Sequence, residues 1–278
     1  ATTGMTVAAN GAYNVSITGS TNSIAGDTNF LNTGLTTIGN SATDNSTFIG
    51  GLGAVSVGGV NIAGTVATTN TGMDLAATTL TDDATLRSGA GAINVTTITD
   101  GGSSFNLSLG SVGQTGTITF SDNVTVNTLT TFDSAYDIRL QGAANVVDTD
   151  TNFLNTGTTT IGNGGATSSA FTGGLGAVAG PVNISGTIST TNADIDLGAS
   201  TLISGVTLKS GSGAINVASV TGGFDLTLGD AGQTGTVTFT GNLSANSLIT
   251  FAQAYAVTLQ GTTNVITTDT NFLNTGAV

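Results

Sequence analysis

A long internal repeat constrains the fold of this chain more than any other feature. The string DTNFLNTG begins at Asp27, Asp150 and Asp269, so its copies lie 123 and 119 residues apart. Residues 105–142 also align without gaps to residues 224–261, with 21 identities in 38 positions. Biased composition alone does not hold register over so long a stretch. The chain is therefore built from repeats of about 120 residues.

The tyrosines mark the boundaries of these repeats. Each is preceded by Ala and follows the same spacing: Tyr13, Tyr136 and Tyr255. We accordingly divide the chain into the end of a preceding repeat (1–12), repeat 1 (13–135), repeat 2 (136–254) and the start of a further repeat (255–278). Because the sequence starts and ends within a repeat, we expect the parent protein to continue in one or both directions.

Differences between the repeats indicate which positions matter to the fold. Apolar positions exchange Ile for Val or Val for Leu, whereas charges are freely lost. Asp122 of repeat 1 corresponds to Gly241 of repeat 2, and Arg139 of repeat 2 corresponds to Thr258 of the next repeat. A chain that keeps its apolar pattern and loses its ionic one is typical of a scaffold rather than of a catalytic site.

The composition favours strands and turns. Only 7% of residues are charged, against about 25% in typical domains. β-Branched residues, which favour strands, and Gly and Asn, which favour turns, dominate instead. A mean hydropathy of +0.29 argues against disorder. The net charge of −13 with three basic residues argues against nucleic acid and anionic lipid as partners.

Short stretches of alternating apolar and polar residues predict the fold class. Examples are 105–109 (FNLSL) and 116–120 (GTITF), with Gly-rich turns between them. No segment shows a sustained helical period. The chain is predicted to be all-β, and a parallel β-solenoid with about 20 residues and about 4.8 Å per turn is favoured. Tandem β-sandwich domains of about 120 residues are the alternative.

Several phrases in these strands resemble a known family. SGAGAINV (88–95) and FNLSLGSVGQTGTITF (105–120) resemble the β-strand repeats of large bacterial surface proteins of the filamentous-haemagglutinin and autotransporter-passenger type. The resemblance covers nearly the whole chain. It implies a right-handed β-helix, export to an extracellular or cell-surface location, and a role in adhesion, aggregation or matrix building.

Candidate catalytic residues are few. Polysaccharide-acting β-helix enzymes need paired carboxylates, or Ca²⁺ with a basic residue. The acidic pairs here are Asp82–Asp83, Asp148–Asp150 and Asp194–Asp196, and Arg139 is a candidate base. The repeat 2 segment that matches Asp82–Asp83 lacks both acids, and the chain has no His or Cys. We expect no enzymatic activity, no catalytic residue and no cofactor.

The aspartates that open DTNFLNTG are the best candidate metal ligands. Asp27, Asp150 and Asp269 recur in all copies beside Asn and Thr oxygens, which suit Ca²⁺. The favoured interpretation is an Asx-turn, in which the carboxylate accepts backbone N–H groups, so no metal site is assigned.

The recurrent tyrosines have two interpretations. They could be adhesive aromatics at the surface. The favoured interpretation packs each ring against the stacked turns and leaves its hydroxyl at the surface.

The function predicted from the sequence is structural. We expect a segment of an extracellular fibre or stalk at a microbial surface, whose partners are copies of itself, through end-to-end stacking or continuation of a longer chain. An adhesin repeat region that binds glycans or other cells is the second hypothesis. A polysaccharide-acting β-helix enzyme is the third.

Overall fold

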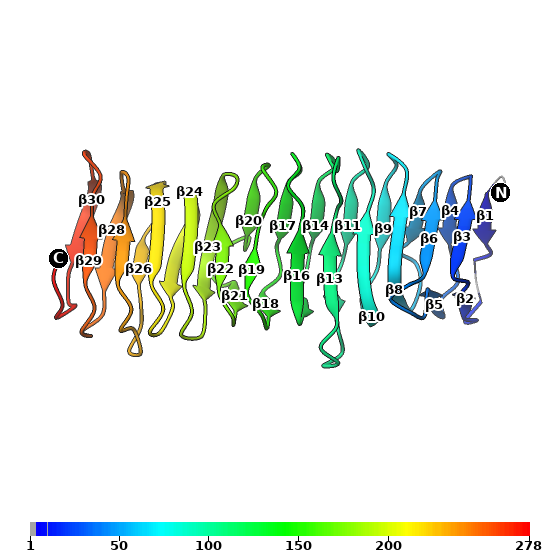
Figure 1. The fold of residues 1–278 in the computed structure, drawn as a ribbon, viewed down its shortest axis with the longest axis horizontal. Helices are drawn as coiled ribbons and strands as arrows, with labels where there is room; N and C mark the ends of the chain where they lie inside the picture. The colour runs from blue at the N-terminus through cyan, green and yellow to red at the C-terminus, as the bar shows by residue number, and fades with distance from the viewer. Residues whose placement is uncertain (1–3, 10) are drawn as a thin grey trace. The chain divides into compact units, whose positions relative to one another are not determined.

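The computed structural model describes residues 4–9 and 11–278, and this part of the chain contains strands and no helix. It divides into two compact units, 1–139 and 140–278, which are treated in turn. In each unit the strands run side by side in parallel, and each strand pairs with one that lies a full turn further along the sequence (Figure 1). The predicted parallel β-solenoid is confirmed. The alternative of tandem β-sandwiches is wrong, because a sandwich is built from antiparallel sheets.

Three parallel sheets form the first unit, and every turn gives one strand to each. Sheet 1A contains β1 (Met5–Val7), β4 (Thr28–Phe30), β7 (Leu52–Ala54), β9 (Met73–Leu75), β11 (Ile93–Val95) and β14 (Ile118–Phe120). Sheet 1B contains β2 (Val15–Ile17), β5 (Leu35–Ile38), the starts of β8 (Gly59–Thr68) and β10 (Thr78–Arg87), β12 (Ile98–Thr99) and β15 (Val124–Val126). Sheet 1C contains β3 (Thr21–Ile24), β6 (Asn45–Phe48), the ends of β8 and β10, β13 (Asn106–Leu109) and β16 (Thr128–Thr131).

The second unit follows the same plan. Sheet 2A contains β19 (Thr151–Asn152), β22 (Leu175–Ala177), the starts of β24 (Ile195–Lys209) and β25 (Ile215–Thr221), β27 (Val237–Phe239) and β29 (Val257–Leu259). Sheet 2B contains β20 (Thr159–Ile161), the start of β23 (Val182–Ser189), the middle of β24, the end of β25, and the starts of β28 (Ser244–Thr250) and β30 (Val265–Asn271). Sheet 2C contains β18 (Ala144–Val147), β21 (Ser168–Phe171), β26 (Leu226–Leu228) and the ends of β23, β24, β28 and β30.

Strand β17 (Ile138–Leu140) spans the boundary between the two units. The length of a turn varies along the chain. The turn that leads from Val60 to its partner Thr78 is clearly shorter than the turn that leads from Ile98 to its partner Val124. The longer turns carry their extra residues in Gly- and Ser-rich loops, such as the one at 100–104, because such loops tolerate insertion without disturbing the strands.

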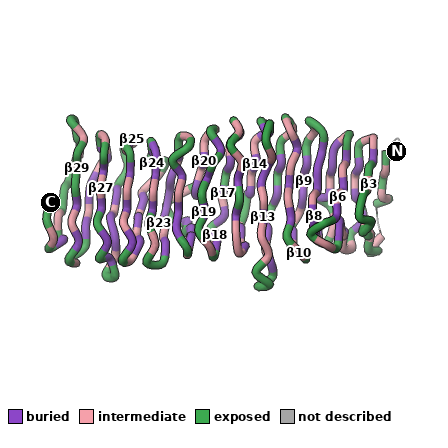
Figure 2. Tube along the Cα trace, in the orientation of Figure 1, coloured by how far each residue is buried: buried purple, intermediate pink, exposed green. Residues whose placement is uncertain are grey.

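The core of each unit is a set of aliphatic columns. Along most strands the side chains alternate between a buried inner position and a more exposed outer position, as the purple and pink or green segments of the tube show (Figure 2). Parallel pairing places similar residues directly above one another. Leu208 pairs with Leu228, and Val206 pairs with Leu226. Each such buried Leu or Val contributes about 1.5–3 kcal/mol relative to an exposed one.

Aromatic rings extend these columns in equivalent places. Phe30 and Phe48 meet edge to face with ring centroids 6.4 Å apart. Phe153 and Phe171, their counterparts in repeat 2, meet in the same way at 6.1 Å. Such pairs contribute about 0.5–1.5 kcal/mol beyond their buried area, so the two copies preserve a packing contact and not only a composition.

Buried glutamines hold one corner of the solenoid. The Gln114 carbonyl oxygen accepts the backbone N–H groups of Ser88 and Gly89, both at 3.0 Å, and its amide donates to the Gly116 carbonyl at 3.1 Å. Gln233 makes the matching bonds to Ser210 and Gly235 in the second unit. At this bend between sheets, these backbone N–H and C=O groups have no partner on a neighbouring strand, and the glutamine side chain supplies their hydrogen bonds. Among the described residues that are not exposed, every fully buried side-chain N or O atom has a partner.

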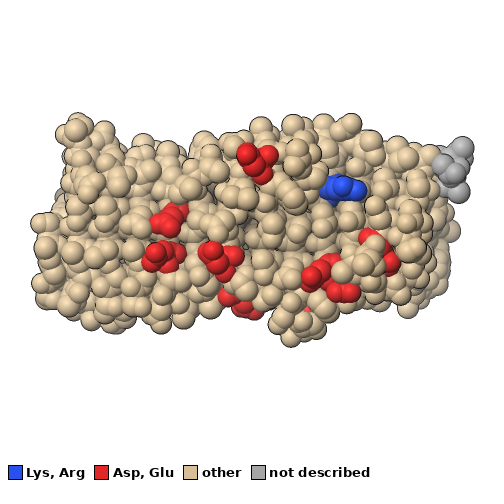
Figure 3. Space-filling model, viewed as in Figure 1, with Lys and Arg blue, Asp and Glu red and all other residues tan. Residues whose placement is uncertain are grey.

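The outer surface carries few charges. Most of the face drawn in Figure 3 is neutral, with separate groups of acidic side chains and one basic group. The outward strand positions hold mainly Thr, Ser and Asn, which suit the exposed face of a strand without adding charge.

The alternation within one strand predicts two different mutational costs. Leu226→Ala removes a fully buried side chain and should destabilise the protein by about 2–5 kcal/mol. Thr227→Ala, one residue along on the outer face, should change stability by no more than about 0.5 kcal/mol. Denaturant unfolding followed by far-ultraviolet circular dichroism measures both. Equal losses for the two variants would contradict an inward column at Leu226.

Candidate functional site

One polar row on the outer face recurs unchanged in both repeats. Its members occupy the same register on neighbouring strands of sheet 1A, and again on sheet 2A. In the first unit they are Asn29, Gly53, Asp74, Asn94 and Thr119. In the second they are Asn152, Gly176, Asp196, Asn216 and Thr238. Since most other charges are lost between repeats, this Asn–Gly–Asp–Asn–Thr row is the best candidate for a functional surface.

Hydrogen bonds tie the row together. In the first unit Asn29 donates its amide to the Asp27 carboxylate at 2.7 Å, and Asn94 donates to Asp74 at 2.7 Å across neighbouring strands. The second unit repeats both bonds, from Asn152 to Asp150 and from Asn216 to Asp196, each at 2.8 Å. The row is therefore held by side chains that already satisfy one another.

Glycine in the row makes room for the asparagine. A Cβ atom at Gly53 would lie 2.5 Å from the Asn29 side-chain oxygen, and one at Gly176 would lie 2.2 Å from that of Asn152. Real Cβ atoms essentially never approach so closely. In the second unit Gly176 lines a shallow hollow between the acidic residues on either side.

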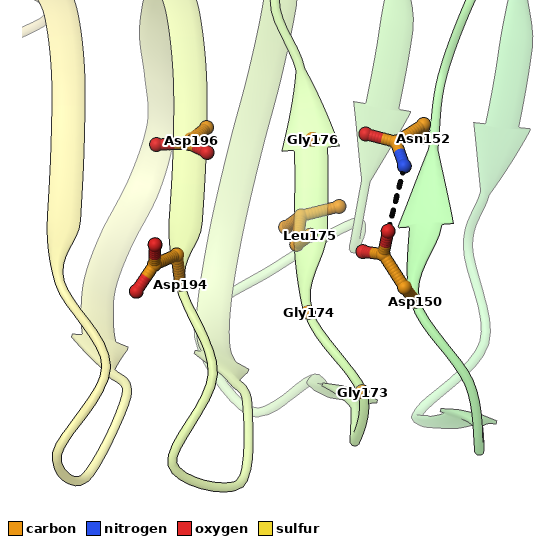
Figure 4. A pocket seen from close by; sticks show the side chains of 8 residues that line it. All are labelled: Asp150, Asn152, Gly173, Gly174, Leu175, Gly176, Asp194 and Asp196. Carbon is orange, nitrogen blue, oxygen red and sulfur yellow. Dashed lines mark hydrogen bonds between the residues drawn. The ribbon is translucent and has the colours of Figure 1, made fainter.

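The hollow in the second unit measures about 270 Å³ and is lined by Asp150, Asn152, Asp194, Asp196 and the segment 173–176, which leads into β22 (Figure 4). The glycines within and just before β22 lie between Asp150 and the two other aspartates. Asp196 is on β24, and Asp194 immediately precedes that strand. Two steps of a parallel sheet, about 9–10 Å, separate the backbone near Asp150 from the backbone that carries Asp194 and Asp196. Oxygen ligands of Ca²⁺ lie about 2.3–2.6 Å from the ion, so the three acids do not converge on one point.

This arrangement bears on the calcium hypothesis. No group of three or more Asp side chains that could hold a metal ion occurs in residues 4–9 and 11–278. Each carboxylate lining the hollow also accepts a hydrogen bond: Asp150 from Asn152, Asp196 from Asn216, and Asp194 from the backbone N–H of Ala214 at 2.7 Å. The partner of Asp27 and Asp150 is thus the side chain two residues further on. Asp269 lies in β30, on sheet 2C.

The Asp82–Asp83 pair accepts hydrogen bonds from the backbone. Asp82 accepts the N–H of Ala42 at 2.9 Å, and Asp83 accepts the N–H of Asn106 at 2.9 Å. Each carboxylate therefore joins one turn to another. Asp148 and Asp150 are both exposed. Arg139, the candidate base, lies 3.8 Å from Asp137 in a largely exposed ion pair, which contributes little to stability.

The structure corrects the expectation for two tyrosines. Tyr136 and Tyr255 are each only 1% exposed, and their hydroxyls do not reach the surface. The Tyr136 hydroxyl donates to the Leu109 carbonyl at 2.8 Å and accepts the Phe132 N–H at 2.9 Å. Tyr255 makes the same bonds to Leu228 and Phe251. The carbonyl partners come from the preceding turn, which single-strand patterns do not reveal.

Tyr13 differs from its two counterparts. It is 43% exposed, and its hydroxyl donates to the Ala8 carbonyl at 2.8 Å. The buried pair is therefore structural, and of the three tyrosines only Tyr13 has substantial exposed area for the adhesive role that the sequence left open.

The asparagine near the end of DTNFLNTG was missed as a structural residue. Asn32 is fully buried, and its amide donates to the carbonyls of Tyr13 at 3.1 Å and Gly34 at 3.2 Å. Asn274 does the same with Tyr255 and Gly276. The sequence carries a signal for this role, because the asparagine and the tyrosine keep the same separation in every copy.

The leucine in the same string is partly exposed in every copy. Leu31, Leu154 and Leu273 are 37%, 48% and 49% exposed. Val55 and Val178, which follow the next strand of each sheet, are also exposed. Single exposed apolar residues are ordinary, but the same one in three copies indicates a surface that the repeats share.

Comparison of the chain with protein-family models, with curated proteins and with solved structures finds no match. Within the described residues, no helix has the length and apolar character needed to cross a membrane. The class of protein is therefore defined by its fold alone: a parallel β-solenoid built from long repeats.

The buried tyrosines predict a loss of stability at high pH. Burial raises the pKa of the Tyr136 and Tyr255 hydroxyls above the ordinary value of 10.0, although hydrogen bonds partly oppose this. Above pH 10 the unfolded chain ionises first, so the free energy of unfolding falls as pH rises through the folded-state pKa.

Thermal unfolding between pH 8 and 12 tests this effect. The double variant Tyr136→Phe/Tyr255→Phe should be less stable at pH 8 but should lose less stability per pH unit above 10. Tyr13→Phe is the matched control and should keep the steep decline. A double variant with an unchanged slope would refute the assignment.

Dispersed carboxylates predict a weak response to calcium. At about 1 mM, the range of extracellular calcium modules, Ca²⁺ should raise the unfolding temperature no more than Mg²⁺ does, because both ions only screen the net negative charge. A larger shift with Ca²⁺ that is lost in Asp150→Asn would contradict this interpretation.

Proposed function

We propose that this chain is a structural segment of an extracellular fibre or stalk, formed by stacked β-repeats at a microbial surface. The observation that carries the proposal is the pairing of each strand with the strand one turn later, in both units. A solenoid adds turns without a change in its core, since each turn contacts only its neighbours. That property suits a spacer whose length is set by the number of repeats.

The side chains support a mechanical role. Aliphatic columns and satisfied corners occupy the inside, and the outside is mostly neutral Thr, Ser and Asn. The three basic residues, Arg87, Arg139 and Lys209, give trypsin-like proteases few targets. These features favour persistence outside a cell over the binding of a small substrate. Partners are then copies of the chain, or further repeats of a longer parent.

We infer no catalytic activity. The carboxylates of the recurrent row, Asp74 and Asp196, accept hydrogen bonds from asparagine amides. In the second unit the glycine-containing strand β22 separates Asp196 from Asp150. General acid–base catalysis by two carboxylates requires both to face one bond, and this arrangement does not favour it.

An adhesin remains the second candidate, on one specific observation. The leucine of DTNFLNTG recurs in all three copies although 37%, 48% and 49% of its surface is exposed. A glycan array and cell-binding assay with Leu31→Ser/Leu154→Ser/Leu273→Ser would separate this role, because adhesion would fall in the variant whereas a spacer would be unaffected.

Electron microscopy and fibre diffraction of the purified protein test the structural proposal. We expect elongated particles or fibres, with a meridional reflection near about 4.8 Å from strands stacked along the axis. Leu226→Asp, which places a charge in the core, should abolish both, and Thr227→Asp should retain them. Compact particles without this reflection under all conditions would contradict the proposal.

A further inference from the structure

We propose that a repeat does not contain a whole number of solenoid turns. Each repeat therefore places its recurrent surface one sheet earlier, in the order in which the chain visits the three sheets, than the repeat before it. The significance of this for a fibre rests on the proposed function, but the register itself does not. A repeat of six complete turns would contain 18 strand positions. The pairings indicate five turns and two further strands, which is one position fewer.

The second unit contains two copies of DTNFLNTG and places them on different sheets. In the first copy, Thr151 pairs with Leu175, and this sheet, 2A, continues to Val257. In the second copy, Thr270 pairs with Leu248, which pairs with Leu226 on sheet 2C. Identical residues therefore lie on sheets 2A and 2C of one unit.

The path of the chain explains the difference. Strands visit sheets 2A, 2B and 2C in that order, as Thr151, Thr159 and Ser168 show. Five full turns from Thr151 lead to Val257 on sheet 2A, and two more strands lead through Val265 to Thr270 on sheet 2C. A repeat of whole turns would have brought the motif back to sheet 2A.

The first unit shows the same shift with a different motif. After Tyr13, Val15 pairs with Thr36 on sheet 1B. After Tyr136, the Asp137 carbonyl accepts the N–H of Ile118 at 2.9 Å, which sets the strand beginning at Ile138 against sheet 1A. The tyrosine motif has thus also moved to the preceding sheet. The tyrosine motif in the first unit and DTNFLNTG in the second therefore both show a shift of one sheet per repeat.

The shift determines how the shared surface is displayed. Because each repeat moves the exposed leucine and its neighbouring Asp–Thr–Asn by one sheet out of three, they return to the same sheet only at every third repeat. A surface confined to one side would favour flat ribbons of fibres. A surface that visits all three sheets presents equivalent contacts in three directions and favours bundles or meshes.

Engineered disulfides test the phase in the purified chain, which has no native cysteine. Neighbouring parallel strands have Cα atoms about 4.8 Å apart, within the range of about 4.4–6.8 Å seen for disulfides. We expect Ile249→Cys/Asn271→Cys to form a bond on mild oxidation, because these residues are paired on sheet 2C. Thr258→Cys/Asn271→Cys should stay reduced, although it would bond if the copies were in phase.

Thr238→Cys/Thr258→Cys, a paired position on sheet 2A, is the positive control. Bond formation in the Thr258–Asn271 variant would overturn the inference. Failure of the Ile249–Asn271 variant, while the control pair oxidises, would overturn it as well. Thiol titration gives each answer on unassembled protein, so a chain that forms no fibres could still confirm the phase, and a fibre-forming chain could still refute it.

Discussion

The parallel hydrogen bonds between strands one turn apart are the constraint on which the rest of this structure depends. They fix the register, and the register decides which side chains face inward, because a shift by one residue would turn every aliphatic side chain outward. Leu226 and Thr227 illustrate this, as one is fully buried and the other lies on the outer face. The repeats accordingly conserve the apolar pattern and let exposed charges vary.

Corners are the second requirement, since a chain that turns three times per layer removes backbone groups from the ladder. Buried Gln114 and Asn32, with their counterparts in repeat 2 and the next repeat, satisfy these groups with side-chain amides. Tyr136 and Tyr255 do so with hydroxyls. The most strongly recurrent polar residues are therefore explained by packing. The Asn–Gly–Asp–Asn–Thr row and the exposed leucine remain as candidates for an external role.

Much of the fold could be predicted from sequence, because alternation within strands such as 105–109 is local. The boundaries of turns could not, since β24 runs through all three sheets without a Gly-rich loop. The buried hydroxyl of Tyr136 was also out of reach, because its acceptor, Leu109, belongs to another turn. For the candidate site, recurrence identified Asp27 and Asp150, but only the register revealed that Asp74 and Asp196 lie in one row with the neighbouring asparagines.

Native-state hydrogen exchange of Leu226→Ala tests most directly whether packing passes from turn to turn. The account predicts that amide protection falls in the strands stacked directly on β26, namely the ends of β24 and β28, each a full turn away along the chain. Loss of protection confined to the neighbouring strands in sequence, β25 and β27, would contradict it, because such a pattern belongs to strands that pair with their nearest neighbours along the chain.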